Sequence, residues 1–199
     1  MTEQEVFILA DRALNDVVAQ IADDQWSMGM PPTFARRESA EPPTLREIVN
    51  NHAYDDAWVP DMLAGKMMDE VGKDKFKGDL LGADPKKAFS AIVDKACASV
   101  RIFDSPDMTV HTSFGDFPAR SYLAQITYYR GLRVHDIAKV IGVDPTLSDE
   151  LVRGLWDVLS PVADEWRGYG VFPAAVPVPA DAPLHDRLLG LTGRDPNAA

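Results

Sequence analysis

The chain has 199 residues, of which 46% are apolar and 26% charged, a composition typical of globular proteins that excludes a disordered chain. Its formal net charge of −11 repels phosphate backbones, so nucleic acid is excluded as a partner. No apolar run reaches the ~18 residues that cross a bilayer, and the acidic start lacks a secretory signal. We therefore expect a cytoplasmic protein that contacts no membrane. The single cysteine, Cys97, excludes an intramolecular disulfide.

The first predicted helix covers residues 3–22, where apolar side chains recur at intervals of three and four residues and Asp11 falls on the polar face. The following segment, residues 23–43, contains two pairs of adjacent prolines, and prolines at this density exclude a continuous helix. We expect a long loop there, which Trp26 anchors to the core.

A second helix is predicted over residues 45–68, because Thr44 and Glu47 have the spacing of a capping box. Pro60 predicts a kink or a break within it. The charged, glycine-containing residues 69–83 are predicted to connect this helix to the next one.

The third predicted helix begins at Pro85, with Asp84 as its N-cap, and ends before Ser105. Its inward-facing side chains are predicted to be Ala88, Ile92, Ala96, Cys97 and Val100. The alternating, β-branched residues 108–113 then predict an extended segment that is too short to form a sheet by itself.

The fourth predicted helix begins at Pro118, runs to about Ile141 and stops at Gly142. A further helix is predicted over residues 147–168, with Thr146 or Ser148 as its cap. The tail then contains four prolines in residues 171–183 and is predicted to be extended, with one or two helical turns over residues 186–191.

These elements predict an all-α fold, an antiparallel four-helix bundle with a short extended segment and a C-terminal extension. We expect a single domain over residues 1–199, with its core at about 3–170 and the extension at 171–199.

A histidine and an aspartate four residues apart on the second helix have a spacing that suits a metal ion. His52 and Asp56 share one face of the helix, and imidazole and carboxylate groups both bind borderline cations. The same spacing suits a hydrogen-bonded pair without metal, so both alternatives stay open. Cys97 falls on the predicted inner face of its helix, which indicates a small buried side chain.

Two arginines fall on or beside the apolar stripe of the fourth predicted helix. A buried guanidinium needs an anionic partner, because desolvating it alone is too costly. We therefore predict an interhelical ion pair from Arg133, assisted by Arg130, to Asp55 or Asp56. His135 lies about 200° from Arg133 around the helix, so the two side chains cannot both face inward.

Several stretches of the chain resemble, in the same order, the mycothiol-dependent maleylpyruvate isomerase-like proteins of actinobacteria, part of the DinB/YfiT-like group. These stretches are residues 43–50 (PTLREIVN), 110–119 (VHTSFGDFPA), 136–139 (DIAK) with Gly142, 177–183 (PVPADAP) and 191–196 (LTGRDP). The resemblance covers nearly the whole chain and implies a four-helix bundle, in agreement with the predicted elements.

The resemblance also implies a divalent metal ion, often zinc or nickel, at one end of the bundle. In such proteins a histidine on the second helix binds the ion, together with an acidic residue and a histidine four apart on a later helix. An open coordination position lets the metal activate water or the thiol cofactor mycothiol. In this chain the aligned positions hold Asn51, Tyr129 and Arg133. An arginine there repels a divalent cation and prefers carboxylates.

Two hypotheses follow for the function. In the first, the protein has the bundle but no metal, and we expect no cofactor. It then binds a small anionic molecule or acts as a stress-related module. The site residues are then Arg130, Arg133, Asp55, Asp56, Tyr129 and Asn51. In the alternative, the protein is a divalent-metal-dependent and mycothiol-dependent isomerase or transferase with the rearranged ligands His52, Asp56 and His135. The resemblance also implies a homodimer.

Overall fold

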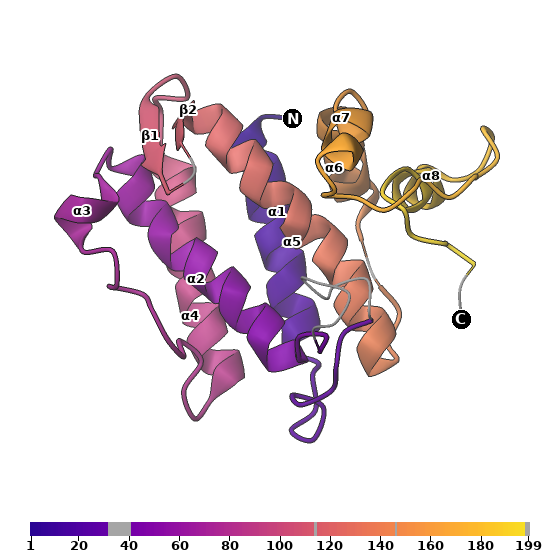
Figure 1. Cartoon of the computed structure of the whole chain (residues 1–199), viewed down its shortest axis with the longest axis horizontal. Helices are drawn as coiled ribbons and strands as arrows, with labels where there is room; N and C mark the ends of the chain where they lie inside the picture. The colour runs from indigo at the N-terminus through magenta and orange to yellow at the C-terminus, as the bar shows by residue number, and fades with distance from the viewer. Residues whose placement is uncertain (32–40, 114, 146, 198–199) are drawn as a thin grey trace. The chain divides into compact units, whose positions relative to one another are not determined.

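The computed structural model describes residues 1–31, 41–113, 115–145 and 147–197, and the fold is mostly helical (Figure 1). The predicted all-α class is therefore confirmed, with a small hairpin as an addition. Contacts divide the chain into two compact units, Thr2–Pro145 and Thr146–Ala199. Within the described residues, no helix has both the length and the apolar character that a bilayer crossing requires.

Helix α1 (Glu3–Val18) begins with a capping box that the sequence analysis missed. The amide of Thr2 donates to the Glu5 carboxylate at 2.8 Å, and the amide of Glu5 donates to the Thr2 hydroxyl at 3.2 Å. The helix ends four residues earlier than predicted. Trp26, in the segment that follows, is buried as predicted, whereas residues 32–40 of the loop predicted over 23–43 lie outside the described part of the chain.

Helix α2 (Leu45–Leu63) begins with the predicted capping box of Thr44 and Glu47. It ends five residues before the predicted position 68, and Pro60 lies in its last turn. The short helix α3 (Met68–Val71) follows, within the segment that was expected to be mainly a connection.

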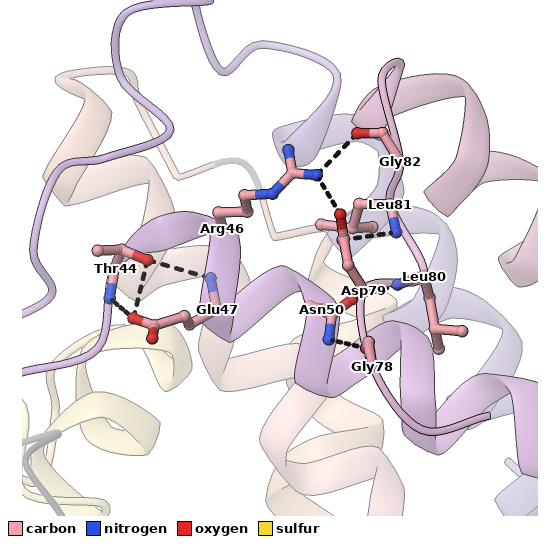
Figure 2. Close-up of polar contacts among 9 residues, drawn as sticks. All are labelled: Thr44, Arg46, Glu47, Asn50, Gly78, Asp79, Leu80, Leu81 and Gly82. Carbon is pink, nitrogen blue, oxygen red and sulfur yellow. Dashed lines mark hydrogen bonds and ion pairs between the residues drawn. The ribbon is translucent and has the colours of Figure 1, made fainter. Parts of the chain in front are cut away.

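The loop after α3 is fastened to α2 by side chains of the helix (Figure 2). Asn50 donates to the Gly78 carbonyl oxygen at 3.0 Å and accepts from the Leu80 amide at 2.8 Å. Arg46 donates to the Asp79 carboxylate at 2.8 Å and to the Gly82 carbonyl oxygen at 2.7 Å. These bonds satisfy polar groups of a loop that has no strand or helix of its own to pair with.

Helix α4 (Pro85–Ile102) has the predicted N-cap, because the Asp84 side chain accepts from the Lys87 amide. Its buried face was predicted correctly only in its C-terminal half. Phe89 and Val93 are fully buried, whereas the predicted Ala88 and Ile92 are partly exposed. In the first half of α4 the buried face therefore lies one residue, about 100° of helix rotation, from the predicted face. This rotation buries a phenylalanine instead of an alanine and so removes more apolar area from water.

The extended segment forms a hairpin rather than a lone strand. Strand β1 (Thr109–Thr112) pairs antiparallel with β2 (Gly115–Pro118), and His111 lies opposite Asp116. The partner strand was missed because its glycine, aspartate and proline are residues that strands usually avoid.

Helix α5 (Ala119–Ile141) follows Pro118 and ends at Gly142, as predicted. Gly142 has φ 74°, a left-handed conformation that favours glycine at the end of a helix. The last carbonyl of the helix accepts from the Gln25 side chain, so the C-terminal ends of α5 and α1 lie together.

Helices α1, α2, α4 and α5 pack against one another, with α1 between α5 and α4 and with α2 against α4 and α5 (Figure 1). Gln4 donates to carbonyl oxygens at the C-terminal end of α4, so α1 and α4 are antiparallel. The neighbours α1 and α5 are parallel, as are α2 and α4. A wholly antiparallel arrangement was therefore wrong, because the segment between α2 and α4 is long enough to run back along α2, so that both helices begin at the same end (Figure 1).

The unit Thr146–Ala199 begins with α6 (Asp149–Leu159), capped by Ser148 as predicted; Thr146 lies outside the described residues. The predicted helix over 147–168 is interrupted, and α7 (Ala163–Gly168) is separate. Pro161 lies between α6 and α7 and accounts for the interruption, because proline lacks the amide that helix continuation requires. The proline-rich segment is extended as predicted and contacts α8 (Leu184–Leu191), where the Val176 amide donates to the Gly190 carbonyl oxygen at 2.9 Å.

Candidate functional site: a buried aspartate–arginine cluster

Arg130 of α5 has no exposed side-chain surface and lies between carboxyl groups from two other helices. Its Nε lies 2.6 Å from Asp11 Oδ1 on α1 and donates to Asp56 Oδ1 on α2 at 2.9 Å. Its Nη2 also donates to Asp56 Oδ1, and its Nη1 donates to the Ile126 carbonyl oxygen at 2.6 Å. We call Asp11, Asp56 and Arg130 the Asp–Arg cluster. Neither aspartate has any exposed side-chain surface.

Helix α4 contributes to the same place through Cys97, whose thiol donates to Asp11 Oδ2 at 3.8 Å. The guanidinium carbon of Arg130 lies 5.1 Å from the centre of the Phe7 ring of α1, a cation–π contact. Helices α1, α2, α4 and α5 therefore each place at least one side chain at the cluster.

Burial and charge act against each other in this cluster. Burial raises the pKa of Asp11 to about 6, although Arg130 beside it lowers that pKa. Burial likewise raises the pKa of Asp56 well above its usual value, against the opposing effect of Arg130. Burial alone would lower the pKa of Arg130, but Asp56 and Asp11 outweigh it and raise that pKa. The guanidinium of Arg130 therefore stays protonated, whereas the raised pKa values of Asp11 and Asp56 make these carboxyl groups easier to protonate than exposed ones.

The structure gives the central position to Arg130, which the sequence analysis had treated as an assistant to Arg133. Arg130 lies seven residues before Ile137 and seven after Leu123, both buried, so it stands in the middle of the inner face of α5. Arg133 is turned away from this line, and its Nη1 lies 3.3 Å from Asp136 Oδ2 on the same helix. An interhelical ion pair to Asp56 is present, and it is made by Arg130, which was predicted only to assist Arg133.

Asp11 is the cluster member that sequence reasoning missed, because it was assigned to the polar face of its helix. A signal was available, since position 11 lies four residues after Phe7 and three before Leu14, both fully buried. That spacing places Asp11 on the apolar face of α1.

The other predicted residues differ in exposure. His52 is 5% exposed, and burial together with Arg133 and Arg130 lowers its pKa well below the usual value. The imidazole is therefore neutral. Tyr129 is 41% exposed, and the side chains of Asn51 and Asp55 are exposed on α2.

The residues present do not fit a divalent metal ion at this place. In the described part of the chain, no group of three or more His, Cys, Asp or Glu side chains is arranged to hold one. Asp56 Oδ1 already accepts two N–H bonds from a guanidinium, whose charge repels a cation. His135 is buried on α5, and Asp56 offers the rearranged ligand set only Oδ2, because its Oδ1 accepts from Arg130.

Comparisons with known proteins add no family to these observations. The chain matches no protein-family model, no curated protein and no solved structure at a significant level.

Proposed function

We propose that the unit Thr2–Pro145 is a helical bundle of the DinB/YfiT-like type that binds a small anionic molecule without a metal, as a binding or stress-related module. The resemblance of the sequence motifs supports the bundle type, as does the packing of α1, α2, α4 and α5 around one interior. The proposal concerns binding and leaves open whether a reaction follows.

The observation that carries this proposal is the positive charge of Arg133 beside α2. The guanidinium of Arg133 is close enough to His52 to lower its pKa and close enough to Tyr129 to oppose the effect of burial on that phenol. In the proteins that the sequence resembles, a metal-binding histidine stands at the position that aligns with Arg133. Arg133 also pairs with Asp136 of its own helix at 3.3 Å, so a bound anion would share the guanidinium with that carboxylate. A fixed cation attracts the anions that a metal would attract, such as carboxylates and phosphates.

Arg130 does not bind the ligand in this proposal, because it already forms ion pairs with Asp11 and Asp56 in the interior. It fixes α5 against α1 and α2 and so holds Arg133, one turn further along α5, in place. A ligand would meet Arg133 with Tyr129, 41% exposed, beside it.

The test is a binding titration of the full chain with two probes, inorganic phosphate and succinate, followed by calorimetry. We expect saturable binding of at least one probe, and at least a tenfold weaker affinity in Arg133→Leu, a loss of about 1.4 kcal/mol. The matched control is Arg101→Leu, which removes the same charge from an exposed position on α4 and leaves affinity unchanged. No binding of either probe, or equal binding by Arg133→Leu, contradicts the proposal.

A second titration with zinc and nickel addresses the metal-dependent alternative. We expect no stoichiometric uptake by protein purified without chelator. Stoichiometric metal that is lost in His52→Ala would replace the proposal with that alternative.

A further inference from the structure

The chain between α3 and α4 runs back along α2 without a helix or strand of its own (Figure 1). Its residues 72–80 are exposed or partly exposed, whereas the next residue, Leu81, is fully buried. We call residues 72–80 the strap. A segment that buries so little apolar surface has no core of its own, so its attachment to the bundle depends on a few individual contacts.

The end of the strap near α3 is attached to α2 by one charged and one aromatic contact. Lys75 Nζ donates to Asp61 Oδ2 at 2.7 Å, and the same ammonium group lies 4.8 Å from the centre of the Phe76 ring. Phe76 packs edge-on against Trp58 of α2, with 5.0 Å between the ring centres. The charge of Lys75 therefore supports both contacts of this attachment.

The other end of the strap is held by polar side chains from an earlier part of α2 (Figure 2). Asn50 donates to the Gly78 carbonyl oxygen at 3.0 Å and accepts from the Leu80 amide at 2.8 Å. Arg46, one turn before Asn50, adds an ion pair to the strap. Asn50 precedes Asp61 by about three turns of helix, which is about 16 Å, so the two attachments share no contact.

The closed strap leaves one polar group of α2 unsatisfied. The indole N–H of Trp58 is buried and has no hydrogen-bond acceptor within the described residues. A buried donor without a partner costs free energy, and contact with water removes that cost. Opening the strap takes Phe76 away from the Trp58 ring, so the unsatisfied indole favours the open state.

We infer that the strap opens as one unit while the bundle stays folded, and that opening uncovers Trp58 on α2. Gly72 supplies a hinge at one end, because its φ of 95° favours glycine and nothing lies within 4 Å of the place of a β-carbon. The buried Leu81 fixes the other end. One exposed residue, Lys77, joins the two attachments, so neither moves far without the other. The bundle helices pack directly on one another, so their packing does not depend on the strap.

The test is amide hydrogen exchange of the full chain, measured by NMR in wild type and in Lys75→Met. Methionine keeps an apolar stem and removes the charge, which weakens the attachment at Asp61. Exchange at the Leu80 amide, which belongs to the other attachment, should become about threefold to tenfold faster. Exchange at the Val59 amide inside α2 should stay unchanged, because the bundle does not open with the strap.

Lys77→Met is the matched control. It removes the same charge from a position nearer to Leu80, where the lysine is exposed and pairs with the exposed Asp74. Exchange at Leu80 should therefore keep the wild-type rate in this variant. An unchanged rate at Leu80 in Lys75→Met overturns the inference, because the two attachments then open separately. Equal acceleration at Leu80 and Val59 overturns it too, because the strap then opens only together with the bundle.

The indole N–H of Trp58 gives a second readout, at the place that opening uncovers. Its NMR signal is assigned by its loss in Trp58→Phe. We expect its exchange with water to become faster in Lys75→Met, and also in Asn50→Ala, which weakens the strap at its other end. Indole exchange at the wild-type rate in either variant overturns the inference, because the strap then does not act as one cover over Trp58.

Discussion

Arg130 Nε donates to Asp56 Oδ1 at 2.9 Å, so two side chains that are 74 residues apart and fully buried connect α5 to α2. Around this bond the interior of the unit Thr2–Pro145 is largely apolar. A shift of either helix along its axis would leave a charge in that interior without its partner. The bond therefore favours one register of the helices over its alternatives.

Replacing Arg130 with leucine should destabilise the protein strongly, because it leaves two buried carboxyl groups without a cation. We expect a loss of about 3–5 kcal/mol in the free energy of unfolding at pH 8, measured with urea. The loss should be smaller at pH 5, because Asp11, whose pKa is already raised to about 6, is then protonated. Arg101→Leu, an exposed control on α4, should change stability by less than about 0.5 kcal/mol. Equal stability of the two variants would show that the cluster contributes nothing.

The same comparison ranks the two arginines of α5. Arg133 retains 11% side-chain exposure and pairs with Asp136 on its own helix, so its loss leaves Asp11 and Asp56 with their buried cation, Arg130. Arg133→Leu should therefore cost less than Arg130→Leu, contrary to the sequence-based expectation that Arg133 holds the central position. A larger loss for Arg133→Leu would restore that expectation.

The elements with strong local signals were predictable from the sequence. Thr44 with Glu47, and Asp84 with Pro85, mark helix starts through bonds that form within three residues. Gly142 marks a helix end through a backbone conformation of its own. These features depend on neighbours in the chain, so periodicity and capping rules suffice to find them.

The site was less predictable, because it depends on the packing of residues far apart in the chain. A buried arginine on α5 implied an acidic partner, and Asp56 was among the two that were named. Asp11 was missed because a polar residue on a helix is more often exposed than buried. Arg130 and Arg133 were hard to distinguish because their directions around the helix differ by only about 60°. Only the packed interior decides such cases.

Asn50→Ala should loosen the loop that crosses α2, since Asn50 bonds to both Gly78 and Leu80 (Figure 2). We expect a loss of about 1–3 kcal/mol, the cost of leaving backbone groups of the loop unsatisfied. Hydrogen exchange at the Leu80 amide should also become faster. The neighbouring Asn51→Ala is the matched control, because Asn51 is exposed and should be neutral for both measurements. Unchanged exchange at Leu80 in Asn50→Ala would mean that the loop is held by other contacts.

Cys97 should resist alkylation in the native protein. Burial, with Asp11 nearby, raises the pKa of the thiol to about 12, and only the thiolate reacts. As the single cysteine of the chain, it gives an unambiguous signal with iodoacetamide at pH 8. We expect little labelling of native protein over a time in which protein in urea is labelled completely. Labelling at the same rate in both conditions would contradict the buried position.

Asp61 should make the protein sensitive to acid. Burial raises the pKa of Asp61, but hydrogen bonds from Lys66 at 2.8 Å and Lys75 at 2.7 Å outweigh it and lower the pKa overall. A lowered folded pKa contributes stability above the unfolded value, and this stability is lost as the pH falls below about 4. Urea unfolding of Asp61→Asn should therefore show a weaker acid dependence than wild type. Asp74→Asn, which removes a pair between exposed groups, should follow the wild-type curve.

Gly190→Ala should destabilise the unit Thr146–Ala199, because α8 and the extended segment leave no room for a side chain at this glycine. A methyl group there would lie 2.7 Å from the Val176 carbonyl oxygen and would also overlap the Val178 side chain. The segment must move away, at a cost of about 1–3 kcal/mol that calorimetry of the full chain can measure. Gly168→Ala in α7 is the matched control, because nothing lies within 4 Å of the added methyl group and alanine favours a helix over glycine. It should be neutral or raise stability by up to about 1 kcal/mol. Tolerance of alanine at position 190 would mean that the extended segment does not pack against α8.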